Sequence, residues 1–226
     1  MELYEQVITG KFISRPNRFI AHVETAAGEE ICHVKNTGRC AELLTPGAIV
    51  TLSAGSNPFR KTRYDMVAVK KGNLYINMDS QAPNRAAEDA LPRLLTGLTL
   101  LKPEKNYGDS RLDFYFERGE EKGFVEVKGV TLEQDGAALF PDAPTERGVK
   151  HIHELEKCVG EGYTAYLLFV IQMKGPHLFG PNRATHPAFA DALVHAKKAG
   201  VRVMAYDCLV TPTGMTIDSP VRIELE

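Results

Sequence analysis

The sequence predicts a two-domain protein in which a β domain precedes an α/β domain. The chain has 226 residues, which is enough for one large domain or two small ones. Up to residue 78, short segments of strand character are separated by turn signals. After residue 80, strand-like and helix-like segments alternate, as in layered α/β structures whose sheet is at least partly parallel. We therefore predict domains at 1–80 and 81–226.

The first domain is expected to be a small barrel or a sandwich. In residues 18–25 the side chains of Phe19, Ala21 and Val23 fall on one face of a strand, because alternate residues share a face. Four more short strands are expected at 31–34, 48–53, 64–70 and 74–78. Short strands at this spacing are typical of small closed or sandwiched sheets.

The second domain combines helices with buried strands. The residues 163–173, YTAYLLFVIQM, are apolar without alternation, which predicts a strand buried on both faces. Helices are expected at 86–95, 145–159 and 186–200, and further strands at 111–117, 123–130 and 201–210. We expect a mixed α/β sheet, and an edge strand such as 201–210 would allow a homodimer.

Composition bears on the cellular compartment. No apolar run approaches the roughly 20 residues that span a bilayer, and the first ten residues lack the apolar region of a signal peptide. The four cysteines are scattered and form no CxxC pair, as expected of reduced thiols. We expect a cytoplasmic protein with no membrane partner.

Charge gives one local signal. The net charge of −2 excludes a general basic field of the kind that attracts nucleic acids. The stretch 58–72, PFRKTRYDMVAVKKG, nevertheless places five cations and two aromatic rings against one acid. The cations are Arg60, Lys61, Arg63, Lys70 and Lys71. Such a patch suits phosphate contacts and base stacking, although an ordinary solvated hairpin explains it equally well.

The octapeptide GFVEVKGV, 123–130, places two charges in a strand that otherwise resembles core. Glu126 and Lys128 share a face because they are two residues apart. A buried charge is costly unless it is paired or bound to a metal, so either an ion pair or a metal site is expected. Asp113, in the preceding strand of a predicted hairpin, favours the metal site. Two carboxylates held together attract a hard divalent cation such as Mg²⁺ or Mn²⁺.

An Asp followed about a dozen residues later by Glu-x-Lys is the PD-(D/E)xK nuclease pattern. Leu112 stands at the proline position, which carries no chemistry. In this pattern a bound cation activates water, and Lys128 would orient the attacking group or stabilise the charged phosphate. By spacing and context alone, a nuclease site and a structural ion pair are about equally supported.

Longer stretches resemble one family. The sequences YGDSRLDF (107–114), EVKGVTL (126–132) and FPDAPTERGVKHIHEL (140–155) are similar to the SfsA family, named for sugar fermentation stimulation. HVKNTGR (33–39) and RPNRF (15–19) fit the same family, and the match is collinear over nearly the whole chain.

The resemblance implies an N-terminal OB-fold-like barrel and a C-terminal PD-(D/E)xK nuclease-like domain. It also implies DNA binding without strong sequence preference. Carried over by position, Asp113, Glu126 and Lys128 match the nuclease core, and Glu88 stands where many such folds place a further acidic metal ligand. The basic-aromatic stretch adds Arg15, Arg18 and Phe19 to the expected DNA-binding residues.

The helix expected after the core strands has one polar face. Arg147, Lys150, His151 and Glu154 follow the i, i+3, i+4, i+7 spacing. This face either looks onto the metal site, with Arg147 and Lys150 contacting phosphate, or is simply solvated. The family resemblance favours the functional interpretation.

These observations lead to one principal prediction and two rivals. We expect a DNA-binding protein with an Mg²⁺- or Mn²⁺-dependent nuclease site. The first rival is a DNA-binding regulator of sugar genes that uses a nuclease-like fold only for binding. The second is a metabolite-binding regulator, although no sequence feature marks a sugar site and the chain has no Trp.

Overall fold

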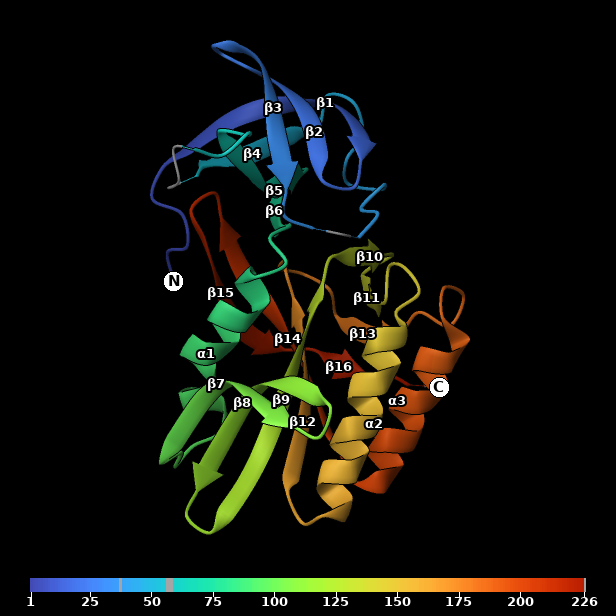
Figure 1. The fold of residues 1–226 in the computed structure, drawn as a ribbon. Coiled ribbons are helices and arrows are strands. Elements are labelled where there is room, and N and C mark those ends of the chain that lie inside the picture. Colours follow the sequence, from blue (N-terminus) through green and yellow to red (C-terminus); the bar gives the residue numbers. More distant parts are fainter. Residues whose placement is uncertain (37, 56–58, 226) are drawn as a thin grey trace.

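The computed structural model describes residues 1–36, 38–55 and 59–225. It places a β-barrel on top of a larger α/β unit (Figure 1). No helix among these residues is long and apolar enough to cross a membrane.

The N-terminal unit is a closed five-stranded, OB-like barrel. Its strands run in the order β3-β2-β1-β4-β5, and a parallel pairing between β3 and β5 closes the ring. Val50, Leu52 and Met66 are fully buried inside it. The sequence predicted either a barrel or a sandwich, and the structure shows the closed barrel. The strands are β1 (Val7–Asn17), β2 (Ile20–Thr25), β3 (Gly28–Val34), β4 (Ile49–Ala54) and β5 (Tyr64–Lys71), and β6 (Leu74–Asn77) pairs antiparallel with β5.

The C-terminal unit is built on a mixed six-stranded sheet in the order β15-β14-β12-β9-β8-β7. The three central strands are parallel, and the outer ones pair antiparallel. Its strands are β7 (Leu100–Tyr107), β8 (Ser110–Arg118), β9 (Glu121–Val130), β12 (Thr164–Ile171), β14 (Arg202–Thr211) and β15 (Gly214–Pro220). A second small sheet contains β10 (Leu132–Gln134), β11 (Ala137–Phe140), β13 (Leu178–Pro181) and β16 (Arg222–Ile223).

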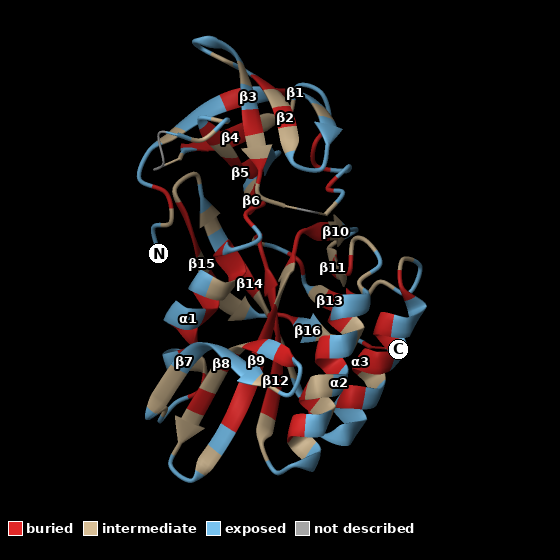
Figure 2. Ribbon diagram, viewed as in Figure 1, coloured by how far each residue is buried: buried red, intermediate tan, exposed pale blue. Residues whose placement is uncertain are grey.

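Helices cover both faces of the large sheet. α1 (Ala82–Leu94) packs on one face, and α2 (Glu146–Gly160) and α3 (Pro187–Ala199) pack on the other. β12 lies between them and is almost wholly buried, as its continuous apolar sequence predicts (Figure 2). α2 begins where expected, because the Thr145 hydroxyl caps it by accepting from the Gly148 amide at 3.0 Å.

The structure differs from the sequence predictions in several features, including the barrel strand β1, which was not predicted. β14, which contains most of 201–210, is not an edge strand, because β15 pairs along its outer side. The prediction that residues 201–210 form an edge strand able to pair with a second subunit is therefore wrong. α1 begins four residues earlier than expected, with a proline in its first turn, and ends two residues after Pro92. β7 was not predicted, because its sequence LLKPEKNY lacks a buried face.

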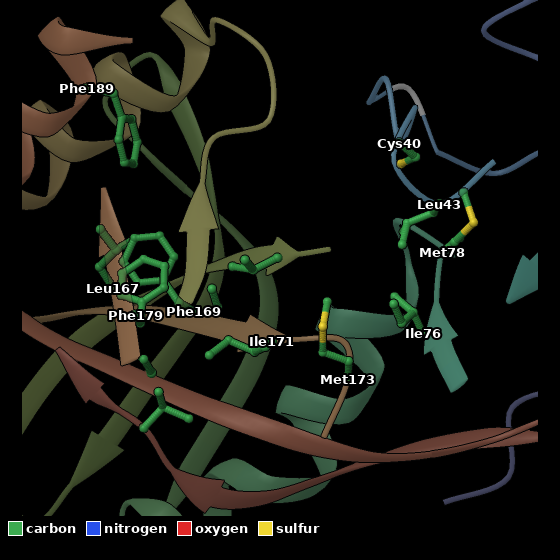
Figure 3. Close-up of a cluster of buried hydrophobic side chains, with 14 of the residues drawn as sticks. Cys40, Leu43, Ile76, Met78, Leu167, Phe169, Ile171, Met173, Phe179 and Phe189 are labelled. Carbon is green, nitrogen blue, oxygen red and sulfur yellow. The ribbon is translucent and has the colours of Figure 1, made fainter. Parts of the chain in front are cut away.

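The two units share a core. One apolar cluster runs from Phe189 and Phe169 through Ile171 and Met173 to Met78 beside the barrel (Figure 3). A buried polar cluster accompanies it. Asp79 accepts hydrogen bonds from Tyr4 at 3.2 Å and from Lys35 at 2.8 Å, and Gln172 donates to Asn77. Such bonds satisfy buried polar groups and fix how the two units meet.

Candidate functional site

The candidate site begins where β8 and β9 stop pairing. The ladder of paired residues runs from Arg118↔Glu121 to Phe114↔Val125. One residue further, the Asp113 carboxylate takes over as acceptor: its Oδ2 accepts from the backbone amide of Val127 at 2.7 Å. The Asp113 side chain is thereby anchored to the backbone next to Glu126, as the predicted hairpin requires.

The second oxygen of Asp113 contacts α1. Oδ1 accepts from Asn84 Nδ2 at 2.8 Å. Burial raises the pKa of Asp113 above its ordinary value, and the negative charge of Glu126 raises it further. The two carboxylates therefore repel each other across the end of the ladder. A cation bound between them would relieve that repulsion.

Glu126 is buried, with 1% of its surface exposed. Its Oε1 accepts from Lys128 Nζ at 2.6 Å and contacts Nδ1 of His151. Burial alone would raise the pKa of Glu126, but the hydrogen bond from His151 and the charge of Lys128 outweigh burial and hold the pKa below its usual value. The carboxylate is therefore ionised at neutral pH. Its Oε2 is also buried, and it has no hydrogen-bond partner among the described residues.

The ion pair and the metal site considered from the sequence are compatible with each other. Lys128 pairs with one oxygen of Glu126, and the other oxygen has no hydrogen-bond partner within the described part of the chain. The strand therefore contains a structural ion pair and an unused buried carboxylate oxygen at the same residue.

The helix α2 also reaches the site, in addition to β8, β9 and α1. His151 is 6% exposed and reaches Glu126 from the helix. Arg147 Nε donates to His151 Nε2 at 3.3 Å, and Lys150 Nζ donates to the carbonyl of Asp109 at 3.3 Å. The polar helix face thus lies against the carboxylates at His151, while Arg147 and Lys150 stay exposed.

The residues present fit a hard divalent cation held partly by water. The unpartnered Glu126 Oε2 and the anchored Asp113 are oxygen donors of the kind that Mg²⁺ prefers, and Mg²⁺ usually retains several waters. Within the described ranges, no three His, Cys, Asp or Glu side chains gather as a complete metal shell. Glu88 is exposed on α1, one turn beyond Asn84, and no contact recorded for the described residues joins it to Asp113 or Glu126. Its role as a ligand stays a prediction.

Several predicted DNA-binding cations in the barrel are engaged within the protein. Arg15 donates to the carbonyls of Arg18, Asn36, Gly38 and Arg39 at 2.7–2.9 Å. Its guanidinium is therefore used to bind backbone carbonyls of the protein itself.

Two of the five cations in the basic stretch are likewise paired within the protein. Arg60 pairs with Asp65, with Nη1 to Oδ2 at 2.9 Å, and Lys71 donates to Glu133 at 2.8 Å. The remaining cations, Lys61, Arg63 and Lys70, are exposed.

Some of these cations lie against aromatic rings. Arg63 lies 5.1 Å from the Tyr64 ring centroid, and Lys70 lies 5.9 Å from that of Tyr75. Arg18 lies 4.9 Å from the ring of Phe19, which is 45% exposed. Of these rings only Phe19 is exposed, and an exposed ring beside a cation is suited to contact nucleic-acid bases and backbone.

A polar cleft of about 450 Å³ lies between the barrel and α1. Lys35, Arg60 and Arg85 line it together with Asp65. Arg85 follows Asn84, which contacts Asp113. The cleft therefore lies between the basic patch of the barrel and the helix that reaches the carboxylates.

Sequence reasoning missed two partners of the carboxylates. Asn84 lies in a stretch that reads as a linker or a helix entry, and no spacing rule connects it to Asp113. His151 was placed on the correct helix face, but its bond to Glu126 depends on how α2 packs against β9.

The fold and the site define a class: an OB-like barrel joined to a mixed α/β sheet whose hairpin carries paired carboxylates and a lysine. Two family models match the chain, "SfsA N-terminal OB domain" over residues 13–78 and "Sugar fermentation stimulation protein RE domain" over residues 81–214. The chain belongs to the sugar fermentation stimulation protein (SfsA) family.

Relatives support this over the full length. The sugar fermentation stimulation protein homolog of Desulfitobacterium hafniense is 53% identical over 223 residues, which is 98% of both chains. That of Ruminiclostridium cellulolyticum is 52% identical over 224 residues, covering 98% of this chain and 99% of the relative. The structure of Pyrococcus furiosus SfsA in complex with Ca²⁺ superposes with a TM-score of 0.89 at 28% identity, covering 99% of this chain and 98% of that one.

Proposed function

We propose that this protein binds DNA and cleaves phosphodiester bonds with the help of Mg²⁺ or Mn²⁺. The observation that carries the proposal is the buried Oε2 of an ionised Glu126 beside Asp113, an oxygen that has no hydrogen-bond partner in the described ranges. Leaving such an oxygen without a partner costs free energy, on the order of 1–3 kcal/mol, and binding a cation would remove that cost. The Ca²⁺ complex of the Pyrococcus furiosus relative, at 28% identity, supports a divalent cation in this family.

The chain's own residues have distinct roles in this proposal. A divalent cation held by Asp113 and Glu126 would neutralise charge on the phosphate and lower the pKa of a nearby water. Lys128, which is held in place by Glu126, adds a positive charge beside the reacting phosphate. Asn84 and the Val127 amide keep Asp113 oriented. Glu88 is proposed as a further acidic ligand.

DNA is proposed to bind without strong sequence preference. The exposed cations of the barrel patch and the exposed Arg147 and Lys150 on α2 would contact phosphates, with Phe19 available for stacking. The cleft lined by Lys35 and Arg85 lies between the barrel and α1. Because these contacts are electrostatic, binding should weaken steeply with salt.

The test is an assay that follows binding and cleavage together. Purified protein is incubated with single-stranded DNA, duplex DNA and RNA, each with Mg²⁺, Mn²⁺ or EDTA. We expect cleavage of DNA only with a divalent cation, and its loss in Asp113→Asn. Binding in EDTA without cleavage in either metal would instead support a non-catalytic DNA-binding regulator. Cleavage that persists in Asp113→Asn or in EDTA would overturn the proposed site.

A further inference from the structure

The two oxygens of Glu126 have different surroundings. Oε1 accepts from Lys128 at 2.6 Å and contacts His151, whereas Oε2 is buried with no partner among the described residues. Buried carboxylate oxygens are almost always hydrogen-bonded. Such asymmetry persists only if something holds the carboxylate in one rotamer.

The direction of each hydrogen bond around His151 follows from chemistry. Arg147 Nε carries a hydrogen and can only donate, so His151 Nε2 accepts at 3.3 Å. An imidazole whose Nε2 accepts has its proton on Nδ1, and Nδ1 is the atom that contacts Glu126 Oε1. The chain of donors therefore runs from Arg147 through His151 to Glu126.

We propose that His151 is a positioning residue for the metal site. Together with Lys128 it holds Oε1, so that Glu126 offers a cation only Oε2 and binds it through one oxygen. This inference rests on the proposed function, because it concerns the same cation. Carboxylates that bind metals are commonly held by such outer hydrogen bonds, and losing one lowers metal affinity by roughly 10–100-fold.

Two substitutions separate positioning from packing. His151 is 6% exposed on the face of α2 that packs against β9, so it also fills space. His151→Leu keeps an apolar side chain of similar bulk but has no donor. His151→Asn is smaller but places an amide N–H near the position of Nδ1. If His151 only fills space, Leu should preserve metal binding better than Asn; if it positions Glu126, Asn should preserve it better.

The experiment is calorimetric titration of the full chain with Ca²⁺, supported by thermal unfolding in EDTA to confirm that each variant folds. We expect His151→Leu to lose about 10–100-fold in Ca²⁺ affinity, and His151→Asn to lie closer to wild type. Equal affinities for wild type and His151→Leu, or better binding by Leu than by Asn, would overturn the role of His151.

Further measurements separate this inference from the proposed function. If Glu126→Gln and Asp113→Asn bind Ca²⁺ as well as wild type, the proposed metal site is wrong. The role of His151 is then still testable without metal, by nitrogen-15 NMR of its ring. We expect a neutral ring with the proton on Nδ1, and a downfield, unprotonated Nε2 that loses its hydrogen bond in Arg147→Met. A proton on Nε2 would contradict the donor chain.

Discussion

The barrel and the α/β unit each contain a group of charged residues that the sequence predicts to be functional. The two groups differ in how far their charges are paired within the protein. In the barrel, Arg15 binds backbone carbonyls and Arg60 binds Asp65. In the α/β unit, Glu126 keeps one buried oxygen that has no partner among the residues that the structure describes. A basic stretch near loops can satisfy itself internally. Charges on adjacent buried strands have few such options, so an unused one there is stronger evidence for a ligand.

The largest expected effect concerns the α/β group. Glu126→Gln keeps the shape and an acceptor for His151 and Lys128, but it removes the charge that would bind a cation. We expect metal-dependent DNA cleavage to fall about 10³-fold, because a cation contributes several kcal/mol to the transition state and each 1.36 kcal/mol is tenfold in rate. Initial rates on labelled DNA measure this.

The matched control for that substitution is Glu104→Gln. Glu104 lies on β7, and its side chain is 66% exposed. We expect its cleavage rate to equal wild type. If the two variants lose the same activity, the loss reflects general electrostatics, and the contrast between buried and exposed carboxylates fails.

A second, smaller effect concerns the barrel group. Asp65 accepts from Arg60 and His33, and Asp65→Asn should lower the free energy of unfolding by about 1.5–3 kcal/mol at neutral pH. Burial alone would raise the pKa of Asp65, but the bonds from Arg60 and His33 outweigh it, so the folded-state pKa is lowered. A lowered pKa means that the stabilisation is present above the unfolded-state pKa and is lost as the pH falls through the folded-state value.

Urea unfolding at pH 7 and at acidic pH checks this sign. The difference between wild type and Asp65→Asn should shrink in acid. A difference that grows in acid, or is absent at pH 7, would mean that the Arg60–Asp65 pair does not stabilise the barrel. Arg60 would then be available for DNA after all.

The smallest expected effect concerns the exposed barrel cations. Lys61 is exposed, so Lys61→Ala should remove at most one phosphate contact. The slope of log affinity against log salt should become about 0.9 less steep for duplex DNA. Lys122→Ala, in the β8–β9 hairpin at the far end of the molecule from the barrel (Figure 1), is the control and should leave the slope unchanged. Equal slopes for all three proteins would place DNA away from Lys61.

Much of the site follows from periodicity. Glu126 and Lys128 share a face because they are two residues apart, and Asp113 reaches them because a hairpin joins their strands. The barrel and the buried strand β12 follow from alternation and its absence.

The rest depends on contacts between distant parts of the chain. Asn84 meets Asp113 across 29 residues, and His151 meets Glu126 across 25, through the packing of helices on the sheet. The free oxygen of Glu126 is set by all of its neighbours together. Likewise, β14 became an internal strand only because β15 folds back along it.

The most direct test of the central claim is anomalous diffraction from crystals soaked in Mn²⁺. We expect a peak at coordination distance from Glu126 Oε2 and from a carboxylate oxygen of Asp113, with Oε1 still bonded to His151 and Lys128. A fully soaked crystal with no peak between these carboxylates, or with the cation bound elsewhere, would contradict it.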